Sequence, residues 1–405
     1  RLAGGNLPPA QLRHLDDAFT RLKLDPERGP PPTDANTHEA FAAYQQWLVH
    51  HDSIDLDDLV ALAGPRLLSD AALLARWRAR TAVLFVDEAQ DLDKTQLDLA
   101  LLLTGERRDL FAVGDDDQTI YAWRLADVRR VLGLAARVPG LRRIDLETNH
   151  RCAPEVVRRA ARLVEHNEER FDKRILSSPR NSGTVRLLPD PGDEVARARL
   201  LLTRWAGEPP DERHAILART NRELVPFAAV ALELGLPYRV EDDGLRWPDE
   251  QALAVLEAAA LHLPPLVAVQ RAAFGARLPP EATADLLAWT AGCRDLAELR
   301  ASIRDRTKAQ QRLRQDHANL TLATAHGTKG LEWEHVACIG HDEGAFPSGR
   351  ALREADDPQR VLEEERRLAY VAWTRARKTL TIVYDPGAPS TFVLEAFDTA
   401  ELAGS

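Results

Sequence analysis

Methionine is absent from this sequence of 405 residues, and cysteine is scarce. The three cysteines, Cys152, Cys293 and Cys338, lie far apart and form no C-x-x-C pair, which argues against a disulfide framework and a structural zinc site. Long apolar runs are also missing, because charged residues and prolines interrupt the most apolar stretch, 252–269. No membrane span is therefore predicted, and since no signal-peptide pattern opens the chain, we expect a cytoplasmic protein.

Positive charge is in deficit, with 53 Lys and Arg residues against 63 Asp and Glu residues. A net charge of -10 argues against a generally basic coat for nucleic acid but leaves room for a local groove or a stacking platform. None of the few lysines follows a glycine, so the phosphate loop G-x-x-x-x-G-K-[ST] cannot be matched. Because the chain opens on Arg1 without an initiator methionine, we expect it to be a piece of a longer reading frame.

The remaining composition, 44% hydrophobic and 29% charged, is typical of a globular protein, and the length predicts two or three domains at about 150 residues each. Patterning predicts a parallel α/β unit made of a strand at 83–86, a helix at 94–104 and a strand at 110–113. Further strands are predicted at 143–146, 320–323, 336–339 and 380–384, and helices at 154–167 and 362–376. Residues 245–318 are rich in alanine and leucine and predict a helical insertion into a second α/β portion.

Asp87 and Glu88 directly follow the apolar run Val83–Val86. Open parallel sheets bind ligands at the carboxyl ends of their strands, where these two acids are expected to lie. In such a Walker B arrangement the first carboxylate holds a magnesium ion that bridges nucleotide phosphates, and the second orients or deprotonates the attacking water. The alternative is a pair of solvated acids at the end of an ordinary strand.

The next predicted strand also ends in a polar cluster, Gly114–Gln118. Two neighbouring strands that deliver polar groups to one sheet edge favour a ligand site, in which Gln118 is suited to sense a phosphate or to position water. Tyr121 and Trp123 are two residues apart, so in an extended chain their rings face the same side and are suited to stack on successive bases. The alternative for both rings is packing in the interior.

Four longer strings in the sequence resemble the motifs of a known family. In chain order they are Val86–Asp91, Val113–Arg124, Thr324–Trp333 and Glu363–Ala376. They resemble motifs II, III, V and VI of the UvrD, PcrA and Rep helicases, which are superfamily 1 DNA motors, and they occur in the family's order. The likeness extends from about Ile54 to Tyr384 and implies RecA-like P-loop NTPase motor domains, with parallel sheets flanked by helices.

The resemblance implies roles for residues of the first motor domain. Asp87 would hold Mg²⁺, Glu88 would be the catalytic base, and Gln118 would contact the terminal phosphate of ATP. The residues that would line the track for single-stranded DNA are Tyr121, Trp123 and Arg124. Leu125 stands where the family usually has glycine, which would stiffen this track.

The resemblance also implies roles for residues of the second motor domain. The string Leu146–Arg151 resembles motif IV, in which Arg151 would contact the terminal phosphate. His150 stands where the family usually carries a tyrosine that stacks on adenine. Motif V would place His326 on the DNA backbone and Glu332 on the nucleotide ribose.

Motif VI would supply the arginine finger, Arg375, which shares a helix face with Arg367 and Val371 through i, i+4 spacing. The acidic run 363–365 is expected to cap and solvate the first turn of that helix. The family's phosphate loop would lie upstream of residue 1, and its large second-domain insertion, called 2B, would here be short.

The resemblance implies the following domains: a helical segment at 1–80 that returns from 1B to 1A; the latter part of motor domain 1A at 81–141; motor domain 2A at 142–244 and 319–388; a short 2B-like insertion at 245–318; and a C-terminal tail at 389–405.

The resemblance implies an ATP-dependent translocase or helicase that acts on single-stranded DNA and on single-strand/duplex junctions, with 3′ to 5′ polarity, in repair or replication restart. Repair-protein partners and a place at the bacterial nucleoid would follow. One alternative is a module that binds single-stranded DNA or a protein without hydrolysis. Another is the helicase part of a helicase-nuclease, although 385–405 shows no pattern of nuclease carboxylates.

Overall fold

The structure is a computed structural model that describes residues 9–26, 35–106, 109–190, 192–207, 211–241, 250–260, 262–278, 283, 286, 287, 289, 290 and 293–402. It divides into two compact units, unit 1 (Arg1–Leu146 with Asn167–Arg174) and unit 2 (Glu147–His166 with Ile175–Ser405). Within the described ranges, no helix combines the length and apolar character needed to cross a membrane.

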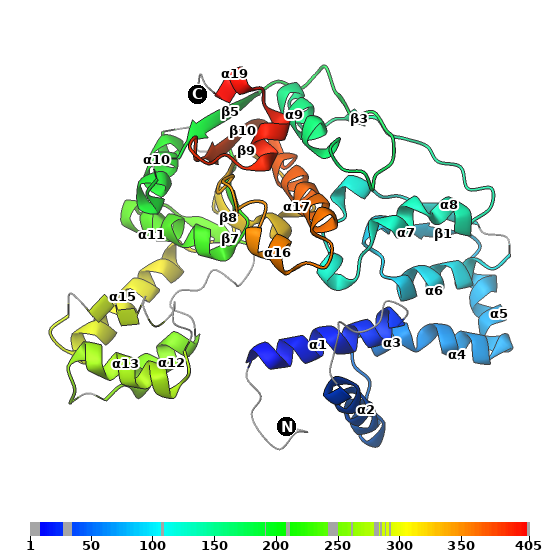
Figure 1. Cartoon of the computed structure of the whole chain (residues 1–405), viewed down its shortest axis with the longest axis horizontal. Coiled ribbons are helices and arrows are strands. Elements are labelled where there is room, and N and C mark those ends of the chain that lie inside the picture. Colours follow the sequence, from blue (N-terminus) through cyan, green and yellow to red (C-terminus); the bar gives the residue numbers. More distant parts are fainter. Residues whose placement is uncertain are drawn as a thin grey trace. The chain divides into compact units, whose positions relative to one another are not determined.

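Unit 1 begins with helices and continues as a small α/β layer (Figure 1). Its leading helices are α1 (Pro9–Leu24), α2 (Ala35–His50), α3 (Asp58–Ala61), α4 (Ala63–Ser69) and α5 (Ala71–Arg80). The buried ammonium of Lys23 on α1 lies 2.6 Å from Asp55 and 2.8 Å from Asp58, which ties α1 to the start of α3. The other elements are β1 (Leu84–Val86), α6 (Lys94–Thr104), β2 (Leu110–Ala112), α7 (Val128–Leu132) and α8 (Leu134–Arg137).

Strands β1 and β2 pair in parallel, with Phe85 opposite Phe111. Helix α6 begins where predicted, because Asp93 and Gln96 form a capping box, and it ends at Gly105. Its buried leucines pack with α8 against one face of the strands. On the other face the side chains of Phe85 and Phe111 are 73% and 56% exposed, so this face is uncovered within the described residues.

Unit 2 is built on a six-stranded parallel sheet in the order β5-β10-β9-β6-β8-β7. The strands are β5 (Thr184–Pro189), β6 (His214–Ala218), β7 (Tyr238–Val240), β8 (Leu320–Thr324), β9 (Trp333–Cys338) and β10 (Ala376–Tyr384). Helices α10 (Glu194–Ala206) and α11 (Val225–Leu234) share one core with the sheet. The helices α9 (Pro154–Val164), α17 (Pro358–Trp373) and α18 (Thr391–Ala396) pack with one another, and α9 and α17 contact β10. The layered α/β architecture agrees with the predicted fold class.

The segment between β7 and β8 is helical and has its own core (Figure 1). It contains α12 (Glu250–Ala258), α13 (Pro265–Gly275) and α15 (Leu296–Leu313). The remaining elements of unit 2 are β3 (Thr148–Asn149), β4 (Leu176–Ser177), α16 (Gly349–Glu354) and α19 (Thr399–Leu402).

Two predictions about secondary structure are wrong in this part of the fold, and two more, at Tyr121 to Trp123 and at Arg375, are corrected with the site below. Residues 143–146 form no strand, because no neighbouring strand pairs with them, and Ile144 and Leu146 are exposed. Helix α17 begins at Pro358 behind the N-cap Asp357, so the acidic run 363–365 lies in the middle of the helix instead of in its first turn.

Candidate functional site

The predicted acids of unit 1 lie at the carboxyl end of β1. Asp87 and Glu88 are both exposed, and the Asp87 carboxylate accepts a hydrogen bond of 2.9 Å from the Glu88 amide. Glu88 has a left-handed backbone with φ 51°, a conformation that costs of order 1–3 kcal/mol and persists only when neighbouring contacts hold it.

Gln90 supplies such a contact and joins the ends of the two strands. This side chain is 1% exposed, its amide nitrogen donates to the Glu88 carboxylate at 2.6 Å, and its oxygen accepts from the Asp115 amide at 3.0 Å. Gly114 makes room for it, because a Cβ at this position would lie 2.6 Å from the Gln90 oxygen. No role was predicted for Gln90, although it lies within the string that follows β1.

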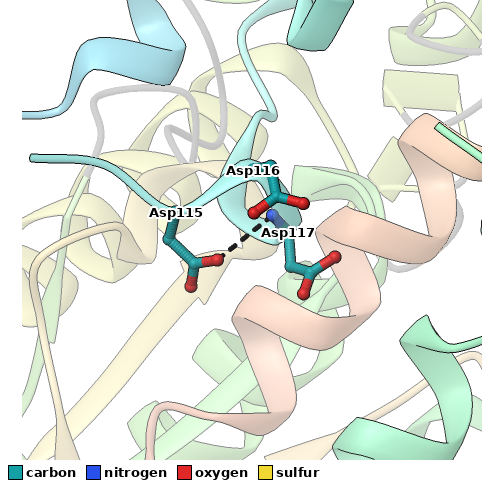
Figure 2. Close-up of side chains that lie close together, drawn as sticks. All are labelled: Asp115, Asp116 and Asp117. Atoms are coloured by element: carbon teal, nitrogen blue, oxygen red, sulfur yellow. Dashed lines mark hydrogen bonds between the residues drawn. The ribbon is translucent and has the colours of Figure 1, made fainter. Parts of the chain in front are cut away.

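Asp115 organises the turn that follows β2. It caps the short helix Asp116–Gln118 by accepting the Asp117 amide at 3.2 Å, a bond drawn in Figure 2, which shows the three aspartate side chains close together. Its second oxygen accepts a hydrogen bond of 2.7 Å from the Gln118 side-chain amide. The two strand ends are therefore linked from Glu88 to Gln118 through Gln90 and Asp115.

The three aspartates could be mistaken for a metal site, since their carboxylate oxygens lie within 4.8 Å of one another. The Lys173 ammonium fills that position, at 2.7 Å from Asp115 and 3.0 Å from Asp117, and it also pairs with Asp116. Arg170 adds two bonds to Asp117, at 3.1 and 2.9 Å. Neither cation could be predicted as a partner, because each lies more than fifty residues along the chain from its aspartate.

The ionic partners outweigh burial in stabilising the charges of Lys173 and Asp115, but not that of Asp117. Burial opposes the charge of Lys173, but the carboxylates, Asp115 foremost, raise the pKa of its ammonium overall. Burial also opposes ionisation of Asp115, and Lys173 outweighs it and lowers the pKa of that carboxyl. For Asp117 burial prevails over Arg170 and Lys173, so its pKa is raised. Protein cations thus occupy the space between the three aspartates, and Asp87 remains the candidate magnesium ligand.

The predicted DNA track lies just beyond this turn. Trp123 is 61% exposed within the described residues, so its ring does not pack in the interior of unit 1, and the Arg124 guanidinium lies 4.9 Å from the ring centroid. The chain is not extended as expected: Ala122–Arg124 form a 3-10 turn, in which the Tyr121 and Trp123 rings meet edge to face at 6.1 Å. Leu125 ends the turn with φ 65°, so it occupies a backbone conformation that favours the glycine usual in the family.

In unit 2, three of the residues predicted to bind the nucleotide lie together. The Asn149 side chain orients the loop by accepting the amides of Arg151 and Cys152, each at 2.9 Å. Arg151 donates to the Glu332 carboxylate at 2.7 Å. The pKa of the Arg375 guanidinium is lowered to about 10, first by burial and second by the positive charge of Arg151, which lies nearby. His150, which directly precedes Arg151 in the chain, is exposed.

Arg375 differs from the prediction in one respect. It lies past the end of α17, where it is 1% exposed and donates to the Val371 carbonyl at 2.9 Å and to the Leu331 carbonyl at 3.2 Å. The expected helix face shared with Val371 is therefore replaced by a bond from the Arg375 side chain to the last turn.

His326 lies on the 3-10 turn Ala325–Thr328. Burial, followed by the nearby charge of Arg219, lowers the pKa of His326 to about 4, so the imidazole is neutral at pH 7. Arg219 is bound by Glu365, and the buried Glu363 pairs with Arg367 at 3.2 Å. The acidic run thus binds cations inside unit 2 instead of being solvated.

Comparison with known proteins gives two family matches, one in each half of the chain. Residues 8–139 match the family described as UvrD/REP helicase N-terminal domain, and residues 288–386 match the UvrD-like helicase C-terminal domain. These ranges contain the Walker B and Gln118 strings and the motif V and VI strings, respectively.

Similar curated proteins are bacterial. The chain is 31% identical over 387 residues to ATP-dependent DNA helicase UvrD2 of Mycobacterium tuberculosis, which covers 88% of this chain and 55% of the relative. It is 25% identical over 452 residues to ATP-dependent DNA helicase Rep of Escherichia coli, covering 84% and 66%. The chain thus spans about half the length of the first of these relatives. A solved C-terminal domain of a possible DNA helicase from Lactobacillus plantarum matches 62% of this chain and 96% of its own length at a TM-score of 0.30 and 12% identity, values too low to indicate a shared fold by themselves.

Proposed function

Because the chain belongs to the UvrD-like family of superfamily 1 helicases, we propose that the complete protein hydrolyses ATP to move along single-stranded DNA. The observation that carries this proposal is the hydrogen-bonded path from Glu88 through Gln90 and Asp115 to Gln118. It links a candidate water-activating carboxylate to a candidate phosphate sensor, two groups that act on the same reaction in phosphoryl-transfer sites.

The two units correspond to the motor domains of this proposal. Unit 1 supplies the latter part of domain 1A behind the helical segment 1–80, and unit 2 supplies domain 2A with a short 2B-like insertion. Arg151, Glu332 and Arg375 of unit 2 would contact nucleotide, and His150 would stack on the adenine.

The residues present fit a magnesium ion at Asp87, since an exposed carboxylate is a suitable hard ligand for this cation. When bound, the ion would neutralise charge on the nucleotide phosphates. Glu88 would orient and deprotonate water, and Gln118 would contact the terminal phosphate, as its bond to Asp115 leaves its amide oxygen in a fixed orientation.

The DNA would pass Tyr121, Trp123 and Arg124. An exposed indole with an adjacent guanidinium supports stacking on a base, which contributes about 1–3 kcal/mol for each base. His326, neutral at pH 7, would offer a hydrogen bond instead of a charge to the DNA backbone. By analogy with the family we infer 3′ to 5′ polarity, action at single-strand/duplex junctions in repair or replication restart, repair-protein partners and a location at the bacterial nucleoid.

We further propose that upstream residues of a longer protein carry the phosphate loop and cover the exposed face of β1 and β2. Two phenylalanines on adjacent strands, Phe85 and Phe111, with ring centroids 5.6 Å apart, are a costly surface to leave in water. A second candidate function is a module that binds single-stranded DNA without hydrolysis, which the exposed Trp123 ring beside Arg124 supports without reference to a nucleotide site.

The decisive experiment measures Mg²⁺-ATP hydrolysis with and without single-stranded DNA, first by this chain and then by the longer protein. We expect no turnover by the chain, DNA-stimulated turnover by the longer protein, and loss of turnover with retained nucleotide binding for Glu88→Gln. Glu39→Gln, which alters an exposed glutamate on α2, is the matched control and should keep full activity. Undiminished turnover by Glu88→Gln would refute the assignment of the base, and DNA binding without any turnover by the longer protein would favour the second candidate.

A further inference from the structure

Residues Asn167–Arg174, here called the strap, belong to unit 1 although the chain on both sides belongs to unit 2. The strap follows α9 and precedes β4, and it is attached to the turn that carries Gln118. The Phe171 amide donates to the Asp116 carboxylate at 2.8 Å, Arg170 forms two bonds to Asp117, and Lys173 contacts all three aspartates.

The two cations of the strap are needed by the turn. Asp116 and Asp117 are 3% and 0% exposed, and a buried carboxylate without a cationic partner is strongly unfavourable. The Lys173 side chain is itself only 16% exposed, so water cannot replace it without reorganising the site. The strap therefore stabilises the conformation of Asp115–Gln118, because it supplies the cations that these buried carboxylates need.

The Asp115 carboxylate is shared between the strap and Gln118. Its Oδ1 atom lies 2.7 Å from the Lys173 ammonium, and its Oδ2 atom accepts the Gln118 side-chain amide at 2.7 Å. A carboxylate is planar and rigid, so fixing one oxygen fixes the direction of the other. The position of Lys173 thus sets the direction in which the Gln118 amide is held.

We propose that Lys173 is a positioning residue for Gln118, acting through Asp115, and that the strap makes the phosphate sensor of unit 1 depend on a segment whose two flanks lie in unit 2. The role of Gln118 in this inference rests on the proposed function. The hydrogen-bonded arrangement itself does not depend on hydrolysis and can be tested without it.

The first test is spectroscopic and uses this chain labelled with ¹⁵N in glutamine side-chain amides, with Gln118→Ala to assign the resonance. We expect Lys173→Met to shift the Gln118 amide and to speed its hydrogen exchange, while the amide of Gln96, which belongs to the α6 capping box, keeps its position. Lys94→Met is the matched control, because Lys94 pairs with Asp98 at 2.9 Å on the surface of the same unit. A Gln118 resonance that is unchanged in Lys173→Met would overturn the proposal.

If Lys173→Met fails to fold, the charge-balanced variant Lys173→Met with Asp116→Asn takes its place, since it removes one carboxylate along with the ammonium. Asp115 still lacks its Lys173 partner in that variant, so the same Gln118 shift is expected. Equal displacement of all glutamine amides would indicate general loosening and would also count against a positioning role.

The second test is a double-mutant cycle on hydrolysis by the longer protein. Lys173→Met should lower kcat about tenfold, the factor for one lost hydrogen bond, without changing KM for ATP, and should cause no further loss in a Gln118→Ala background. Multiplicative losses would overturn the proposal. Absence of turnover in every protein, together with the expected Gln118 shift, would refute the proposed function while supporting the strap.

Discussion

His341 should make the folding stability of unit 2 sensitive to mild acid. This residue follows β9, is 0% exposed, and accepts a hydrogen bond of 2.9 Å at Nε2 from the Trp373 indole. Burial lowers the pKa of His341 to about 3. Protonation would remove the acceptor and place a charge among the rings of Phe346 and Trp373.

The sign and size of the effect follow from linkage. The pKa of the folded state lies below the value of about 6.5 for an unfolded chain, so the unfolded state takes up the proton first and stability falls as the pH drops below about 6.5. Each pH unit contributes about 1.4 kcal/mol, which gives a loss of about 2 kcal/mol between pH 7.5 and pH 5.0.

The assay is urea unfolding, followed by far-UV circular dichroism at both pH values, of the parent and His341→Gln. Glutamine can still accept from the indole but cannot titrate, so the variant should lose about 2 kcal/mol less than the parent. Because other groups titrate in both proteins, only the difference between their losses is interpreted. His38→Gln, on the surface of α2, should behave like the parent. Equal losses in the parent and in His341→Gln would refute the argument.

Other substitutions test single contacts. Leu125→Gly should relieve about 1 kcal/mol of left-handed strain but lose about 2–5 kcal/mol of buried side chain, so urea unfolding should show net destabilisation, and a more stable variant would contradict this balance. Arg367→Met should destabilise by about 3–5 kcal/mol, since it leaves the buried Glu363 carboxylate without this partner; a Tm within one degree of the parent's would show that the pair matters little. Gly114→Ala should displace the bridging glutamine and reduce kcat of the longer protein, while Gly64→Ala, with no atom within 4 Å of its Cβ, should not; equal kcat values would exclude a role for the bridge.

The sequence predicted best those elements whose ends are determined by residues within the same segment. Helix α6 was predicted over its observed range, and the structure shows local causes for both of its ends, a capping box at the start and Gly105 after the last turn. The strand expected at 143–146 failed for the opposite reason, since a strand needs a neighbour and apolar residues alone cannot provide one. The extended geometry expected at Tyr121 and Trp123 failed because the Arg124 and Leu125 amides bond back to Tyr121 and Ala122 in a tight turn.

The family strings located the candidate site residues, but they did not reveal the residues that hold them. Gln90 is buried between two strand ends, and its role becomes evident only when β1 and β2 are paired. Lys173 reaches Asp115 across a separation of 58 residues, which no spacing rule within one sequence can anticipate. Partners of this kind depend on tertiary packing, so single-sequence reasoning finds the reacting groups more readily than the groups that orient them.

The two arginines of the unit 2 site differ in how readily they could engage a phosphate. Arg151 and its partner Glu332 are each about one-third exposed, and ion pairs of this kind contribute about 0–1 kcal/mol, so a phosphate can replace Glu332 at little cost. Arg375 is buried and satisfies two backbone carbonyls, and breaking such bonds to a charged donor costs about 1.5–3 kcal/mol each. At the proposed nucleotide site, Arg151 is therefore the arginine that a phosphate would engage first, and Arg375 would engage only where closing the site offsets the loss of its carbonyl bonds.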